Sequence, residues 1–91
     1  MTKSICFTVT DPVGLYATPA TELVDKMKAY SSDITLHYAA KSVNLKSLMG
    51  VLSLGIPAKA KLEIEANGPD EEAVIKAVET LIKELNISVE E

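Results

Sequence analysis

The segment Lys61–Asn67, KLEIEAN, alternates apolar and charged side chains over most of its length. Successive side chains of an extended chain point to opposite faces, so Leu62, Ile64 and Ala66 share one face and the charged residues share the other. This pattern is typical of a β-strand with one buried face and one solvated face. It therefore predicts an antiparallel sheet that is covered on a single side.

The other strands are predicted from shorter segments. Residues 4–10 alternate in the same way, and so do residues 34–38. A short return strand at 41–45 is expected to complete a hairpin with the latter. The turn between them is Ala39-Ala40, which lacks the Gly or Asn that a tight two-residue turn prefers. The faces expected to be buried carry Ile5, Phe7, Val9, Ile34, Leu36 and Tyr38.

Three segments outside these strands carry helical signals. Thr18 is the predicted N-cap of the first helix, with Pro19 at its first helical position. The second helix is predicted at 47–54, where Gly55 stops it. The third opens at 68–72, where acidic side chains favour the positive end of a helix dipole. The apolar stripes expected to face the sheet comprise Ala20, Leu23, Val24, Met27, Val74, Ala77, Val78, Leu81, Ile82 and Leu85.

These elements follow one another in the order β-α-β-β-α-β-α. The predicted fold class is α+β, an open-faced sandwich in which three helices cover one face of a four-stranded antiparallel sheet. The chain of 91 residues has the size of one domain, so residues 1–91 are expected to form a single unit.

The composition argues against several classes of function. The net charge is −4 and all nine cations are Lys, which argues against binding to nucleic acid or to an anionic membrane. No metal-ligand or Gly-rich nucleotide motif is present, so no metal and no cofactor are expected. Cys6 is the only cysteine, which excludes an internal disulfide, and we expect a buried, inert thiol there. The short apolar runs and the lack of a signal-peptide pattern predict a cytoplasmic protein.

Two motifs resemble those of a known family. Residues 43–56, VNLKSLMGVLSLGI, closely resemble the regulatory-serine segment of the histidine-containing phosphocarrier protein (HPr) from low-GC Gram-positive bacteria. Residues 14–21, GLYATPAT, resemble the active-centre motif of the family, Gly-Leu/Ile-His-Ala-Arg-Pro-Ala. Together with the order of elements, the resemblance extends from about residue 3 to residue 85. It implies an HPr-like fold and a place in the phosphoenolpyruvate-dependent sugar phosphotransferase system.

The chain departs from the active-centre motif at two positions. Tyr16 stands where the family has its phosphorylated histidine, and Thr18 stands where it has an arginine. A neutral imidazole is a good nucleophile near pH 7, whereas a phenol with a pKa of about 10 stays protonated and its phosphate ester is a poor donor. We therefore expect neither an enzyme nor a phosphohistidine carrier. Tyr16 is left open between a partner-contacting ring and a surface residue that replaced a lost catalytic group.

Ser47 has the strongest functional case. The resemblance implies that it is the target of HPr kinase/phosphorylase, whereas the simpler alternative is an unmodified helix N-terminal serine. A phosphate there would add about 1.5 to 2 negative charges where the helix dipole tolerates them, so the surface should change while the fold survives. His37, the only histidine, is expected to be a solvated strand residue and not a displaced phospho-acceptor.

The resemblance also implies a partner-binding surface. Its expected residues are Tyr16, Thr18, Ala20, Lys46, Leu48, Met49 and Leu52. The three apolar residues of the second helix stay open between core and interface, and Lys46 is otherwise a solvated charge. The implied partners are HPr kinase/phosphorylase and a transcriptional regulator of carbon catabolite control or another metabolic protein. A phosphocarrier variant that docks to enzyme I and transport components, and a binding module without phosphorylation, are the alternatives.

Overall fold

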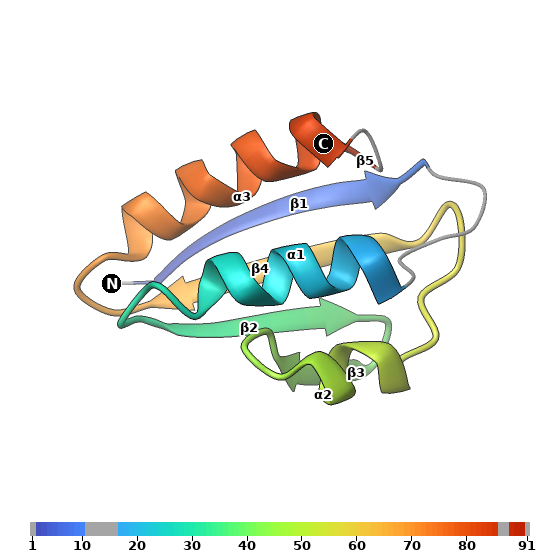
Figure 1. The fold of residues 1–91 in the computed structure, drawn as a ribbon, viewed down its shortest axis with the longest axis horizontal. Coiled ribbons are helices and arrows are strands. Elements are labelled where there is room, and N and C mark those ends of the chain that lie inside the picture. The colour runs from blue at the N-terminus through green and yellow to red at the C-terminus, as the bar shows by residue number, and fades with distance from the viewer. Residues whose placement is uncertain (1, 11–16, 86–87, 91) are drawn as a thin grey trace.

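The computed structural model describes residues 2–10, 17–85 and 88–90 (Figure 1). Its elements, in chain order, are β1 (Thr2–Val9), α1 (Ala17–Met27), β2 (Asp33–Tyr38), β3 (Lys41–Asn44), α2 (Leu48–Ser53), β4 (Lys61–Asn67), α3 (Glu71–Leu85) and β5 (Ser88–Glu90). The predicted order of strands and helices is confirmed up to α3. The strand β5 was not predicted, because its three residues are too few to show a clear alternation.

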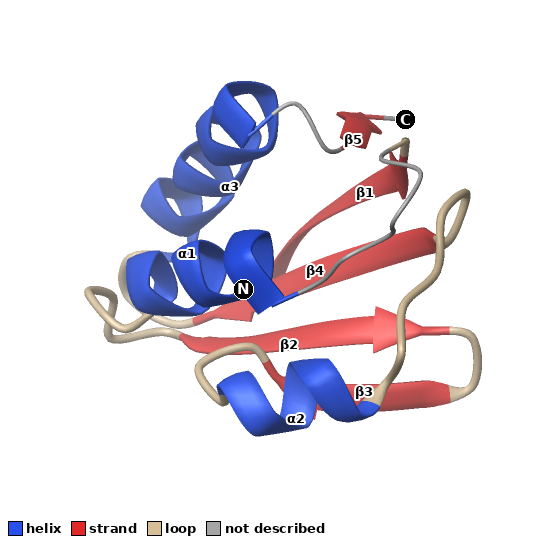
Figure 2. Cartoon of the chain, turned by 45° about the vertical axis from the view of Figure 1, so that its right-hand side comes forward, coloured by secondary structure: helices blue, strands red, loops and turns tan. Residues whose placement is uncertain are grey.

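The strands form one antiparallel sheet in the order β3-β2-β4-β1-β5. β4 lies in the middle, where Ile64 pairs with Ile5 of β1 and with Leu36 of β2. The predicted four-stranded antiparallel sheet is therefore confirmed, and β5 extends it beyond β1. Figure 2 shows that α1, α2 and α3 lie on the same face, which leaves the opposite face open.

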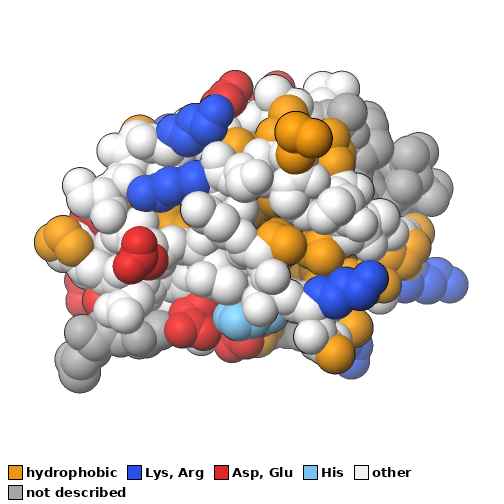
Figure 3. Space-filling view, turned by 90° about the horizontal axis from the view of Figure 1, so that it is seen from below, with side chains coloured by type: hydrophobic (Ala, Val, Ile, Leu, Met, Phe, Trp, Pro, Cys, Tyr) orange, Lys and Arg blue, Asp and Glu red, His pale blue; other side chains and the backbone are white. Residues whose placement is uncertain are grey.

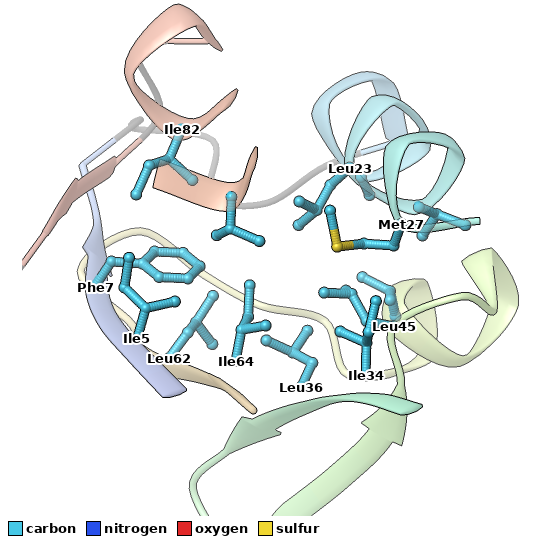
Figure 4. Close-up of a cluster of buried hydrophobic side chains, with 14 of the residues drawn as sticks. Ile5, Phe7, Leu23, Met27, Ile34, Leu36, Leu45, Leu62, Ile64 and Ile82 are labelled. Carbon is cyan, nitrogen blue, oxygen red and sulfur yellow. The ribbon is translucent and has the colours of Figure 1, made fainter. Parts of the chain in front are cut away.

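The core fills the space between the sheet and the helices (Figure 4). The predicted inner faces of the strands are confirmed, since the buried residues include Ile5, Phe7, Val9, Ile34, Leu36, Leu62, Ile64 and Ala66, with Tyr38 partly buried. The helix stripes are also confirmed for Ala20, Leu23, Val24, Met27, Val74, Val78 and Ile82, while Ala77 and Leu81 are partly buried and the side chain of Leu85 lies outside the described part. Burying one such large apolar side chain contributes about 1.5–3 kcal/mol, so this single layer holds the helices on the sheet.

Two local predictions were wrong. Cys6 is exposed and not buried, because it lies between Ile5 and Phe7 and therefore points to the face that no helix covers. α1 begins at Ala17, so Thr18 lies within its first turn and is not the N-cap. A helix can include Pro19 in its first turn because the N–H groups there have no intrahelical acceptor.

The hairpin between β2 and β3 is confirmed, and its turn is strained. The pair Tyr38–Lys41 closes the loop of Ala39 and Ala40. Ala39 has a φ of +54°, and a positive φ at the first loop residue is typical of a type II′ turn, where Gly is preferred. A side chain in this conformation costs roughly 1 kcal/mol. The missing Gly is thus a local strain, and the register of the two strands is kept by the buried face of β2.

A polar clamp, formed by Asp70 with Ser31 and Ser32, joins two loops at one end of the sheet. The Asp70 carboxylate accepts hydrogen bonds from the backbone N–H groups of Ser31 at 2.8 Å and Ser32 at 2.9 Å, and from the Ser32 hydroxyl. These bonds, that from the Ser32 hydroxyl above all, lower the pKa of Asp70. Gly68 passes so close that an added Cβ would lie 2.6 Å from the Cα of Ser32. The clamp thereby fixes where β2 and α3 begin.

Candidate functional site

The turn between β3 and α2 is built by residues that precede Ser47. The side chain of Leu45 is fully buried, and its N–H donates to the carbonyl of Ile34 at 2.9 Å. The side-chain oxygen of Asn44 accepts from the N–H of Lys46 at 2.9 Å, and the Asn44 carbonyl accepts from the N–H of Ser47 at 3.0 Å. The buried leucine thus anchors the turn in the core, while the asparagine reverses the chain and brings Ser47 to the surface.

Ser47 is the N-cap of α2. Its backbone is extended, with φ −110° and ψ 108°, and its Oγ accepts a hydrogen bond from the N–H of Gly50 at 3.2 Å. Its carbonyl accepts from the N–H of Val51 at 3.1 Å, which begins the helical pattern. The residue is exposed, so its hydroxyl lies at the surface. The helix ends six residues later and is followed by Gly55, whose φ of +58° is the left-handed conformation that terminates many helices.

The side chain of Lys46 forms a hydrogen bond within the protein, so its prediction as a solvated charge was wrong. Its Nζ donates to the backbone carbonyl of Tyr30 at 2.7 Å, and the residue is half-buried. Tyr30 lies just beyond α1, and its own N–H donates to the carbonyl of Met27 at 3.1 Å. A cation at this place satisfies a carbonyl near the negative end of the helix dipole. The contact could not be predicted, because nothing in the sequence relates these two segments.

The apolar residues of α2 divide between core and surface. Val51 is buried and Leu48 is half-buried against the core. Met49 is 83% exposed and Leu52 is 40% exposed, which makes them the exposed large hydrophobic residues of the described part. Figure 3 views the side on which α2 and β3 lie and shows hydrophobic side chains reaching the surface there. Leu48 therefore contributes to the core, whereas the contact of Met49 and Leu52 with a partner stays a prediction that their exposure permits.

The remaining predicted site residues have different outcomes. Thr18 is exposed in the first turn of α1, and Tyr16 lies outside the described residues. Ala20 is fully buried, so its inclusion in a partner-binding surface was wrong. The reason is that Ala20 starts the stripe of α1 that faces the sheet, where Leu23 follows one turn later. The family motif that suggested the contact thus also contains core positions.

His37 lies on the open face of the sheet and is not fully solvated. Its Nε2 lies 3.2 Å from Oε1 of Glu65 on β4, and both side chains are partly exposed. Figure 3 shows the histidine beside acidic side chains. Among residues 2–10, 17–85 and 88–90, no group of three or more His, Cys, Asp or Glu side chains could hold a metal ion. Within the same residues, no helix is both long and apolar enough to cross a bilayer.

Comparison with known proteins agrees with the fold and with the motifs. The family model described as the PTS HPr component phosphorylation site matches residues 3–84. The histidine-containing phosphocarrier protein of a Mycoplasma is 32% identical, with a TM-score of 0.87 over 96% of this chain and 97% of its own. The HPr-C-His protein of Thermoanaerobacter tengcongensis is 37% identical, with a TM-score of 0.83 over 89% and 91% of the two chains.

A third similar structure is that of Crh, the Bacillus subtilis catabolite repression protein, described as a domain-swapped dimer. It is 32% identical, with a TM-score of 0.70 over 84% of this chain and 87% of its own. The HPr family consists of phosphocarriers of the phosphotransferase system, and the name of Crh refers to catabolite repression. With a family match over nearly its whole length and the same sheet and helices, this chain belongs to the HPr family of the phosphotransferase system.

Proposed function

We propose that this chain is a regulatory protein of the phosphoenolpyruvate-dependent sugar phosphotransferase system and is not a phosphohistidine carrier. In this proposal, HPr kinase/phosphorylase modifies Ser47 in the cytoplasm. The modified protein then binds a transcriptional regulator of carbon catabolite control or another metabolic protein. The likeness to Crh, whose name refers to catabolite repression, supports a regulatory role.

The observation that carries the proposal is the exposure of Ser47 at the N-cap of α2. The hydrogen bond from Gly50 uses one lone pair of the hydroxyl oxygen, at 3.2 Å. The second lone pair and the hydroxyl proton remain available to a kinase. By the resemblance to the family motif, Tyr16 and Thr18 stand at the two positions where the carriers have a histidine and an arginine. The chain thus keeps the residue that regulation needs and lacks those that relay needs.

The modification is a single phosphoryl transfer. The Ser47 oxygen forms a bond to the γ-phosphorus of ATP, while the bond from that phosphorus to the β–γ bridging oxygen breaks. ADP leaves with that electron pair, and a base of the kinase takes the hydroxyl proton. The product carries about 1.5 to 2 negative charges at the start of α2, the short helix that also carries the exposed side chains of Met49 and Leu52. A partner that contacts this helix would therefore meet both an anion and exposed apolar side chains.

Intact-mass spectrometry after incubation with HPr kinase/phosphorylase and ATP tests this proposal. The wild-type chain should gain one phosphate, and Ser47→Ala should gain none. Ser53→Ala is the matched control, because Ser53 is also exposed on α2 and its Oγ donates to the Gly50 carbonyl at 2.6 Å. A wild-type chain that stays unmodified under conditions that phosphorylate a reference HPr would overturn the proposal.

The second candidate is a phosphocarrier variant that docks to enzyme I and to sugar-specific transport components. It is favoured by the names of two similar structures, which are phosphocarrier proteins. Incubation with phosphoenolpyruvate and enzyme I separates the two candidates. The regulatory proposal expects no phosphate transfer from phosphoenolpyruvate to the chain, whereas a phosphate on His37 or Tyr16 that passes to a transport component would establish the carrier.

A further inference from the structure

We infer that Lys46 is a positioning residue for the modification of Ser47, acting by tying the β3–α2 turn to the end of α1. The inference rests on the proposed function, because it concerns how the hydroxyl is presented to a kinase. The contact that carries it is the hydrogen bond from the Lys46 ammonium to the Tyr30 carbonyl, at 2.7 Å. A charge-assisted bond of this length is among the stronger hydrogen bonds of a protein.

The position of Lys46 in the chain explains how this contact can affect Ser47. Lys46 and Ser47 are neighbours in the chain, so a restraint on one limits the backbone of the other. The residues before them are already held, since Leu45 is buried and Asn44 accepts two backbone hydrogen bonds. The lysine adds a restraint from a different element, because Tyr30 follows α1. The turn is thus fixed both to the sheet beneath it and to the loop that follows α1.

The orientation of the Ser47 side chain depends on this turn. Its Oγ caps α2 through the Gly50 N–H, and the bond is long at 3.2 Å. One neutral hydrogen bond at the upper end of the usual distance range contributes only about 1 kcal/mol, so the backbone must also keep the hydroxyl in place. Phosphoryl transfer depends on accurate placement of the nucleophile, and small displacements lower its rate steeply. Loosening of the turn should therefore lower the turnover of the kinase on this chain more than its binding.

A direct contact between Lys46 and the kinase is the competing explanation, and it predicts a different result. In that case the lysine charge would act on binding, and its loss would raise KM and leave the turn unchanged. In the structure the ammonium donates to a carbonyl of its own chain, and the residue is partly buried, so its charge is already engaged within the protein. The positioning role is therefore the one that the geometry favours.

The experiment compares Lys46→Met, which keeps the apolar stem and loses the donor, with Lys46→Arg, which keeps a donor. Lys41→Met is the matched control, because Lys41 is an exposed lysine of β3. Amide hydrogen exchange of Gly50 in the unmodified protein reports on the cap, with Ile64 in the middle strand as an internal standard. Initial rates with HPr kinase/phosphorylase give kcat and KM separately.

We expect Lys46→Met to raise the exchange of Gly50 roughly tenfold, as suits the loss of one charge-assisted hydrogen bond, with Ile64 unchanged. Its kcat should fall by about the same factor at a nearly constant KM, and Lys46→Arg should restore both. Unchanged exchange, a rise in KM alone, or failure of Lys46→Arg would overturn the inference. A wild-type chain that takes no phosphate would overturn the proposed function, and the exchange data would then show the bond as a structural contact only.

Discussion

Ser32 and Ser47 both lie beside the start of a helix, yet their hydroxyl groups are in opposite situations. Ser32 is fully buried, and its hydroxyl donates to the Asp70 carboxylate just before α3. Ser47 is exposed, and its hydroxyl accepts one long hydrogen bond from a backbone N–H of α2. The comparison teaches that burial and a charged partner make the first serine structural, whereas exposure and a weak neutral partner leave the second available for chemistry.

The largest expected effect on stability is at Gly68, because the absence of a side chain there lets the backbone pass close to Ser32. Gly68→Ala should destabilise the protein by about 2–3 kcal/mol, because the new Cβ meets the backbone of Ser32 at 2.6 Å. Chemical denaturation measures the change. Gly55→Ala is the control, since its positive φ carries strain of about 1 kcal/mol in open space. Equal losses in the two variants would show that crowding at Ser32 has no role.

The next effect concerns the Ser32 hydroxyl itself. Ser32→Ala should lower the free energy of unfolding by about 1.5–2 kcal/mol, because a hydrogen bond to a carboxylate is lost from a buried position. Ser31→Ala keeps its backbone bond to Asp70 and should change stability by less than about 0.5 kcal/mol. If Ser32→Ala were as mild as Ser31→Ala, the clamp would depend on backbone groups alone.

Replacing Ser47 should lower the stability of the protein by less than replacing Ser32, and it should abolish phosphorylation. Ser47→Ala removes the cap of α2 and should destabilise the protein by about 1 kcal/mol, since Ala is a poor N-cap. The same variant should take no phosphate from the kinase. Thermal unfolding and intact-mass measurements on one preparation test both statements. A loss as large as that of Ser32→Ala would mean that Ser47 is structural as well.

The smallest effect is the pH dependence of the clamp. The pKa of Asp70 is lowered in the folded protein, so the carboxylate stabilises the fold above its unfolded pKa of about 3.9. This contribution is lost as the pH falls through the lowered folded pKa. The variant Asp70→Asn has no carboxyl group to titrate at this position. The urea midpoint of the wild type should therefore exceed that of Asp70→Asn by a constant amount near neutral pH. It should shrink below about pH 4, and a constant advantage down to pH 3 would contradict the assigned cause.

Much of the fold could be predicted from local pattern, and the site could be predicted in part. The alternation in Lys61–Asn67 identified the central strand because period two has a single explanation when one face is buried. The place of Ser47 at the start of the second helix was predicted, and its exposure comes from the structure. The burial of Ala20 followed from the helix stripe, and only its place in the partner-binding set was wrong. The exposure of Cys6 was missed because cysteine is usually buried, although the alternation of the strand places Cys6 opposite Ile5 and Phe7. β5 was missed because three residues carry no periodic signal.

The sequence by itself determined the elements other than β5, their order and the likeness to the family, since periodicity, caps and motifs act over a few neighbouring residues. The tertiary structure alone decided the contacts between distant segments. Ser32 and Asp70 are 38 positions apart, and Tyr30 and Lys46 are 16 apart. Such pairs form only when the packed sheet brings two loops together, and no residue in either loop specifies its partner in advance. The physical reason is that hydrogen bonds are local in space, whereas sequence patterns are local along the chain.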